Sequence, residues 1–169
     1  MTRGYTGLMS MRVSPAPIAL DALVAAVEAE VRHRGEGCGA VATFLGVVRA
    51  THRGRRVNYL EYEAYDALAI KVFDRIAAEV AEAWPGAALA IQHRVGRLEI
   101  GEASVAIAAA AAHRAGSFAV CRYAIERIKQ IAPIWKHEFF DDGEAWVEGA
   151  VADPADDAAR RHAYEIACA

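Results

Sequence analysis

The run Ser104–Ala112, SVAIAAAAA, constrains the fold more than any other stretch of the chain. Its length and apolar character predict a β-strand. Because most of its side chains are alanine, the neighbouring elements must pack very closely against this strand. Its apolar part is far shorter than the roughly 20 residues that a membrane-spanning helix needs, so no membrane-spanning segment is expected.

The order of strands and helices predicts an α+β fold. Strands outnumber helices and are joined mainly by short turns, which favours a mostly antiparallel sheet with helices packed against it. Helices are expected at 18–35, 66–84 and 117–132, and strands at 40–49, 57–64, 88–95, 104–112, 134–140 and 145–148. The predicted division is a flexible leader at 1–16, a single catalytic domain at 17–149 and a C-terminal helix or tail at 150–169.

The composition excludes several classes of protein. A hydrophobic content of 55% with 24% charged residues is typical of a soluble globular domain. The net charge of −3 gives no basic field for nonspecific nucleic-acid binding. Three widely spaced cysteines favour a reducing cytoplasm over a disulfide framework. No phosphate-binding glycine loop, no His/Cys metal spacing and no serine nucleophile motif is present in the sequence.

Lysine is rare in this chain, and two of its three lysines lie seven residues apart, at Lys129 and Lys136. The other 16 of the 19 basic residues are arginine. Lysine can act as a base, an acid or a nucleophile, which arginine cannot. The pair therefore indicates chemistry rather than solubility.

A helix-to-strand corner is predicted between the two lysines. Ser117 is expected to cap a helix, and Pro133 is expected to end it at Ala132, before a strand begins. Lys129 then lies at the margin of the helix's apolar stripe, so both amines can face one pocket. The alternative is that Lys129 complements the helix dipole and Lys136 lies on an edge strand. The predicted stripe is Phe118, Cys121, Ile125, Ile128 and Ala132.

Arginine and histidine provide candidate anion-binding groups at two places. Arg49 ends an apolar strand, before the loop ATHRGRR at 50–56, which is either a solvated hairpin loop or a mobile anion-binding loop. His113 and Arg114 lie at the junction of a strand and a helix, which suits a phosphate. The alternative for His113 is a local hydrogen bond to the backbone. Together with the lysines, these groups suit amine-assisted group transfer on a small phosphorylated substrate.

The motifs in this order resemble the large, catalytic subunit of molybdopterin synthase, over about Gly39 to Trp146. The resemblance rests on Gly39-Ala40, Phe44-Leu45-Gly46-Val47-Val48-Arg49, Leu60-Glu61-Tyr62-Glu63-Ala64-Tyr65, His93-Arg94-Val95-Gly96, His113-Arg114, Lys129, Pro133-Ile134-Trp135-Lys136-His137-Glu138, Asp142-Gly143 and Trp146.

The resemblance implies a hammerhead-like α/β fold and a sulfurtransferase that converts cyclic pyranopterin monophosphate to molybdopterin. The sulfur would come from a thiocarboxylate on the C-terminal Gly-Gly tail of a small ubiquitin-like partner subunit. Two large subunits would form a homodimer within a heterotetramer, and no metal or organic cofactor would be needed.

The resemblance also implies roles for individual residues. Lys129 and Lys136 would be the catalytic residues. The substrate-binding residues would be Arg49, His113, Arg114, Val47, Val48, His137 and Glu138. Two other hypotheses fit the residues: a lyase in which Lys129 forms a Schiff base, and a non-catalytic scaffold whose arginine loop binds an acidic partner.

Overall fold

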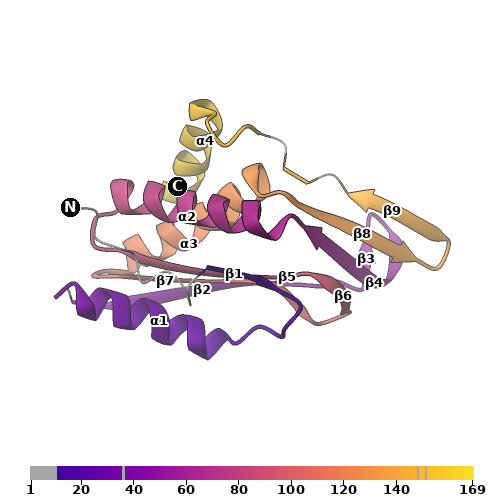
Figure 1. Cartoon of the computed structure of the whole chain (residues 1–169), viewed down its shortest axis with the longest axis horizontal. Helices are drawn as coiled ribbons and strands as arrows, with labels where there is room; N and C mark the ends of the chain where they lie inside the picture. Colours follow the sequence, from indigo (N-terminus) through magenta and orange to yellow (C-terminus); the bar gives the residue numbers. More distant parts are fainter. Residues whose placement is uncertain (1–10, 36, 148, 151) are drawn as a thin grey trace.

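The computed structural model describes residues 11–35, 37–147, 149–150 and 152–169, and has four helices and nine strands in these ranges (Figure 1). The helices are α1 (Leu20–His33), α2 (Asp66–Ala83), α3 (Arg114–Ile131) and α4 (Asp157–Cys168). The strands are β1 (Met11–Ser14), β2 (Ala40–Val47), β3 (Thr51–His52), β4 (Arg55–Ala64), β5 (Ala88–Arg94), β6 (Gly96–Glu99), β7 (Ala103–Ala111), β8 (Ile134–Phe140) and β9 (Gly143–Val147).

The alanine-rich strand β7 lies inside a four-stranded sheet with the order β1-β5-β7-β2. It pairs antiparallel with both β5 and β2, while β1 pairs in parallel with β5. In Figure 1, α1 covers one face of this sheet, and α2 and α3 cover the other. The close packing expected of the alanines is present on the α1 side, where a cluster forms from Leu23, Val27, Val31, Ala88, Ala90, Ala106, Ala108 and Ala110.

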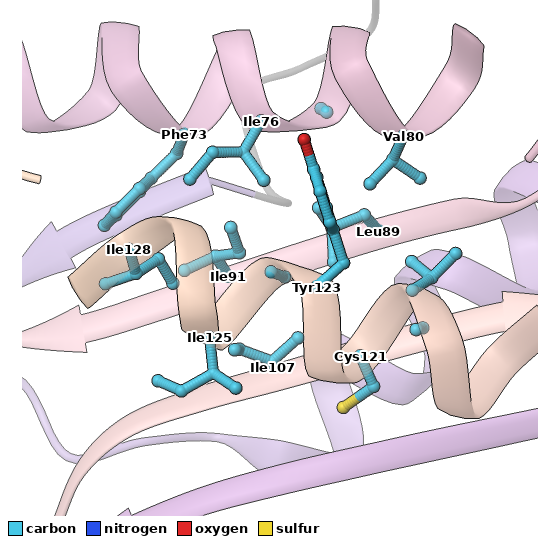
Figure 2. Packing of buried hydrophobic residues seen from close by; sticks show 14 of the residues in the cluster. Phe73, Ile76, Val80, Leu89, Ile91, Ile107, Cys121, Tyr123, Ile125 and Ile128 are labelled. Carbon is cyan, nitrogen blue, oxygen red and sulfur yellow. The ribbon is translucent and has the colours of Figure 1, made fainter. Parts of the chain in front are cut away.

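The larger core lies between the opposite face of this sheet and helices α2 and α3. Figure 2 shows Phe73, Ile76 and Val80 of α2 pointing toward the sheet, where they meet Ile91 and Ile107. These α2 positions recur every three or four residues, which is the spacing that puts apolar side chains on one helical face. Their burial fixes α2 and α3 over β5 and β7.

A second sheet of five strands extends from the first one. Four of its strands have the order β3-β4-β8-β9. The fifth strand, β6, pairs with residues 59–62 of β4, which also pair with β8. All of its pairings are antiparallel. Its small core consists of Val48, Val57, Leu60, Leu98 and Phe140. The predicted α+β class with mostly antiparallel strands is confirmed, although the strands form two sheets.

The structure corrects several expected boundaries. Residues 11–14 form β1, where a leader was expected, while residues 1–10 and Glu148 lie outside the described residues. Strand β6 was not among the expected strands, and it pairs antiparallel with β4. Of the two possibilities for the C-terminal segment, the structure has the helix, α4, whose first N–H groups donate to Asp156.

Helix α3 begins earlier than predicted, at Arg114, so Ser117 is not its cap. The buried Ser117 hydroxyl donates a hydrogen bond to the Arg114 carbonyl, 3.0 Å away, from inside the first turn. Phe118 was expected in the buried stripe but is 67% exposed. The remaining members of that stripe, Cys121, Ile125, Ile128 and Ala132, are buried as predicted.

A buried ion pair joins α3 to α2. The Arg127 guanidinium donates to both carboxylate oxygens of Glu79 at 2.9 Å, and both side chains are buried. The Tyr123 hydroxyl donates to Glu79 at 2.8 Å. Burial acts to raise the pKa of Glu79, but the hydrogen bonds from Arg127 and Tyr123 lower it overall. Arg127 also donates to the Pro154 carbonyl, which ties the segment before α4 to this pair.

Gly39 should be sensitive to substitution, because a Cβ atom there would lie 2.2 Å from the carbonyl oxygen of Ala112. We expect Gly39→Ala to lower the free energy of unfolding by about 1–3 kcal/mol, since backbone must move to relieve the clash. Urea denaturation would measure the loss. Gly37→Ala is the control, because a Cβ atom there meets nothing within 4 Å. Equal stability of the two variants would contradict the expected clash.

Candidate active site

The corner between α3 and β8 carries both candidate lysines. Helix α3 ends at Ile131, the backbone turns at Ala132 and Pro133, and β8 starts at Ile134. A cavity of about 740 Å³ opens at this corner, and both Lys129 and Lys136 line it. The structure therefore brings the two amines to one cavity, as predicted. Its remaining walls come from β2, β3, β4, β5, β7, β9, the β2–β3 connection and residues 149–150.

Alternation along β8 decides which of its side chains face the cavity. Lys136 and Glu138 are two residues apart and both line it. Their charged groups are paired, with Lys136 Nζ 2.6 Å from Glu138 Oε1. The side chain of Glu138 is only 3% exposed. Glu138 is thus a buried carboxylate that holds one of the candidate catalytic amines.

His52 is a second partner of Glu138. Its Nδ1 atom forms a hydrogen bond with Glu138 Oε2, and its ring lines the same cavity. Burial acts to raise the pKa of Glu138, but the hydrogen bonds from Lys136 and His52 lower it overall. Glu138 therefore stays ionised at neutral pH between two groups that can carry positive charge.

The end of β2 forms another wall of the cavity. Gly46, Val47 and Arg49 line it, and Val47 is largely exposed. The register between β2 and β7 shifts at Gly46, where a Cβ atom would lie 2.6 Å from a Val105 methyl group. A glycine inside a strand commonly marks a bulge or a close approach of a neighbour, and both are present at Gly46. Because β2 ends at Val47, Arg49 reaches the cavity from the connection to β3 rather than from the strand.

Val48 does not line this cavity in the described part of the chain. Its side chain is buried in the small core of the second sheet. Its backbone N–H donates to the Glu102 carbonyl at 2.9 Å, and its own carbonyl accepts from Gly101 at 2.9 Å. Val48 fixes the backbone between Val47 and Arg49 instead of facing a ligand.

His137 also points away from the cavity. Its ring stacks on the Trp146 ring, with centroids 4.3 Å apart and 15° between the planes. It also contacts the Phe139 ring, and its Nε2 atom lies 3.7 Å from Glu144. These contacts join β8 to β9 on the face opposite Lys136.

His113 and Arg114 lie at the far end of α3 from Lys129. Both are exposed, with His113 at the N-cap position of the helix. At 1.5 Å per residue, the 15 helical steps from Arg114 to Lys129 span roughly 22 Å. One chain therefore does not bring His113 and Arg114 to the cavity that holds the two lysines.

Polar residues that were not among the predicted site residues also line the cavity: His52, Tyr62, His93 and Ser104. Burial lowers the pKa of His93 to about 4, so its ring is neutral at pH 7 and its Nδ1 donates to the Arg94 carbonyl at 2.8 Å. Burial raises the pKa of Tyr62, whose ring meets His93 edge-on. His93 belongs to one of the motifs on which the family resemblance rests, but no local feature of the sequence places its ring near the lysines.

Among the described residues, no group of three or more His, Cys, Asp or Glu side chains is arranged to hold a metal ion. No helix in the described ranges is both long and apolar enough to cross a membrane.

Comparison with known proteins gives consistent results. The family model described as "MoaE protein" matches residues 13–131. A molybdopterin synthase catalytic subunit from Halalkalibacterium halodurans is 53% identical over 109 residues, which are 64% of this chain and 70% of the relative. One from Nostoc is 41% identical over 140 residues, covering 82% of this chain and 81% of the relative.

A solved structure, that of molybdopterin synthase from Staphylococcus aureus, aligns with a TM-score of 0.74 at 39% identity. The alignment covers 80% of this chain and 95% of the other. With the family model matching well over half of its residues, the chain belongs to the MoaE family, whose curated members include molybdopterin synthase catalytic subunits.

Proposed function

We propose that this chain is the catalytic subunit of a molybdopterin synthase. It converts cyclic pyranopterin monophosphate to molybdopterin by adding the two sulfur atoms of the dithiolene. The observation that carries the proposal is the convergence of Lys129 and Lys136 on one cavity, beside Arg49 and the buried Glu138. This arrangement offers cations for a phosphate and amines for proton transfer around a single bound molecule.

The sulfur donor is a thiocarboxylate at the C-terminal Gly-Gly tail of a small ubiquitin-like subunit. The name of the curated relatives, which calls them a catalytic subunit, supports a separate partner. A tail ending in two glycines is slender enough to enter beside Gly46 and Gly149, which line the cavity. We place the reaction in the cytoplasm, consistent with three cysteines that are all free thiols.

The transfer requires both sulfur attack and water. The thiocarboxylate sulfur attacks a carbon of the pterin side chain and a carbon–oxygen bond of that carbon breaks, which leaves the tail joined to the pterin through sulfur. In one transfer the departing oxygen is that of the phosphate, and in the other it leaves as water. Water then attacks the acyl carbon, the bond from that carbon to sulfur breaks, and the tail leaves as a carboxylate. We assign the proton transfers of the attack step to Lys129. Lys136 stabilises the negative charge that develops, including the phosphate oxygen as its bond to carbon breaks.

Arg49 binds the cyclic phosphate from the β2–β3 connection, since a guanidinium can donate two parallel hydrogen bonds to phosphate oxygens. Val47 borders the bound pterin, while Glu138 orients Lys136. Val48 and His137 support the site from outside the cavity: Val48 fixes the backbone of Arg49, and His137 packs β8 on β9.

The test is to mix the purified chain with a thiocarboxylated small subunit and cyclic pyranopterin monophosphate, and to measure the dithiolene product. The proposal expects two sulfur atoms transferred per pterin and two tails converted to carboxylate. A small subunit ending in an ordinary carboxylate is the control and should give no product. Absence of product with the thiocarboxylated subunit would reject the proposed function.

His113 and Arg114 bind the substrate from a second copy of the chain. They lie roughly 22 Å along α3 from Lys129, so they cannot reach the lysines of their own chain. A homodimer with two-fold symmetry can place the start of one α3 beside the cavity of the other copy. The two exposed cationic groups would then complete a phosphate site that Arg49 begins.

Mixed dimers test this shared site. Arg114→Ala and Lys129→Arg should each be nearly inactive alone, but coexpressed in equal amounts they should regain about a quarter of the wild-type turnover. The reason is symmetry: half of the dimers contain both variants, and each of these has one intact site. Coexpressed Lys129→Arg and Lys136→Arg form the control, because both residues belong to one chain's cavity and every site stays defective. If coexpressed Arg114→Ala and Lys129→Arg showed no recovery of turnover, the shared site would be contradicted.

A further inference from the structure

We propose that His52 is the general base that activates the water in the second step, the release of the tail from sulfur. The inference rests on the proposed function and adds a catalytic residue to it. His52 belongs to the loop ATHRGRR at 50–56. No residue of this loop was among the predicted site residues; Arg49, which was, comes directly before it. The structure turns that loop into a short hairpin, β3 and β4, which carries His52 to the cavity wall.

The two ring nitrogens of His52 have different surroundings. Nδ1 is bonded to Glu138, which is ionised and also paired with Lys136. A carboxylate can only accept, so Nδ1 carries the hydrogen and donates it. In a neutral ring the lone pair is then on Nε2, for which the structure shows no protein partner among the described residues. The side chain is 24% exposed and lines the cavity, so water in the cavity can reach the ring.

The hairpin that carries His52 is held firmly in place. Its two-residue turn, Arg53 and Gly54, has positive φ angles of 50° and 78°, which is the geometry of a tight hairpin. Arg55 pairs with His52 across the hairpin and donates to Asp142 Oδ1 at 3.1 and 2.8 Å. The Arg55 guanidinium also lies 3.7 Å from the centre of the Phe140 ring. Through these contacts the hairpin packs against the end of β8 and the turn between β8 and β9. This packing positions His52 beside Glu138.

The proposed step conserves atoms and charge. Nε2 of His52 takes one proton from a water molecule as the water oxygen attacks the acyl carbon of the tail. The bond from that carbon to sulfur breaks, the sulfur stays on the pterin as a thiolate, and the tail leaves as a carboxylic acid that ionises. The imidazolium that forms keeps its bond to Glu138, whose negative charge balances it. It then returns the proton to solvent through its exposed edge.

Other charged or titratable groups surround His52 and contribute to any pH dependence. They come from β8, β4, the β2–β3 connection, α3 and β5: Lys136, Glu138, Arg55, Tyr62, Arg49, Lys129 and His93. The test therefore compares the wild type with a variant that changes His52 alone.

His52→Asn is the most informative substitution, because its amide can still donate a hydrogen bond to Glu138 but cannot accept a proton from water. We expect kcat for tail release to fall about 100-fold or more, with KM little changed. The acid limb of the kcat–pH profile should flatten in the variant. His162→Asn, on the exposed face of α4, is the matched control and should behave as wild type.

Nitrogen NMR of the wild-type chain gives a second measurement that needs no substrate and no variant. It should show the neutral ring of His52 protonated at Nδ1 rather than Nε2. A ring protonated at Nε2, or a His52→Asn variant with wild-type kcat and an unchanged acid limb, would overturn the inference. Failure of the proposed function is a separate result, since the wild type would then yield no dithiolene at all.

Discussion

Replacing Lys129 with arginine is expected to lower the rate of dithiolene formation by about 100-fold or more, the usual contribution of a positioned acid or base. Arginine preserves the positive charge and a similar length but cannot exchange a proton at neutral pH. Lys129 lines the cavity from the last turn of α3, where it is exposed while Ile125 and Ile128 nearby are buried. The variant should therefore fold normally and bind substrate, so the loss should appear in kcat and not in KM. Single-turnover kinetics would measure it.

Lys71→Arg is the matched control for this prediction. Lys71 is the only other lysine of the chain, and it is exposed on α2 away from the cavity lining. Its replacement should leave turnover unchanged. If Lys129→Arg also retained near-normal turnover, Lys129 would act only through its charge, and its assignment to proton transfer would be wrong.

The second large effect is expected from Glu79→Ala, which should lower the free energy of unfolding by about 3–5 kcal/mol. The substitution leaves the fully buried Arg127 guanidinium without its bidentate partner. Urea denaturation would measure the loss. Replacing both partners together, as Glu79→Leu with Arg127→Met, should recover most of it, because no unpaired charge then stays buried.

Glu82→Ala is the control on the same helix. Glu82 pairs with Arg160 of α4 at 2.6 Å, but its side chain is 71% exposed. Exposed ion pairs contribute at most about 1 kcal/mol, so the control should cost far less. Equal losses in Glu79→Ala and Glu82→Ala would show that burial does not set the strength of the Glu79 pair.

The lowered pKa of Glu79 also predicts the direction of a pH effect. Its unfolded-state reference is 4.5 and its folded value is lower. The ionised pair therefore contributes its full stability above that reference, and the contribution is lost as the pH falls through the folded pKa. Glu138 and Asp142 have lowered pKa values and act in the same direction. The difference in the free energy of unfolding between the wild type and Glu79→Gln, measured as a function of pH, isolates the contribution of the Glu79 carboxylate. This difference should become smaller as the pH falls through the folded-state pKa of Glu79.

Local sequence signals were sufficient to predict the lysine corner. Pro133 ends α3 where expected, and the short step to β8 leaves both amines at one cavity. The close approach at Gly46 and the tight packing around the alanines of β7 can also be inferred from the sequence, because both depend on small side chains at those positions.

Other parts of the site depend on contacts between distant residues. His113 and Arg114 were predicted as a phosphate site from their place at a strand–helix junction, but the 18-residue helix α3 separates that junction from Lys129. The alternation of β8 sends His137 to the face opposite Lys136, which the strand predicted at 134–140 already implies; only the choice of the face that meets the cavity needs the strand's partners. His52 reaches Glu138 across 86 residues of sequence, and no local pattern predicts that pairing.

The most direct test of the central claim is a crystal structure of this chain with cyclic pyranopterin monophosphate, without the sulfur donor so that no turnover occurs. We predict that the pterin occupies the cavity between α3 and β8, with its phosphate at Arg49 and its side-chain carbons within reach of Lys129 and Lys136. A pterin bound at another surface, with neither lysine in contact with it, would contradict the account.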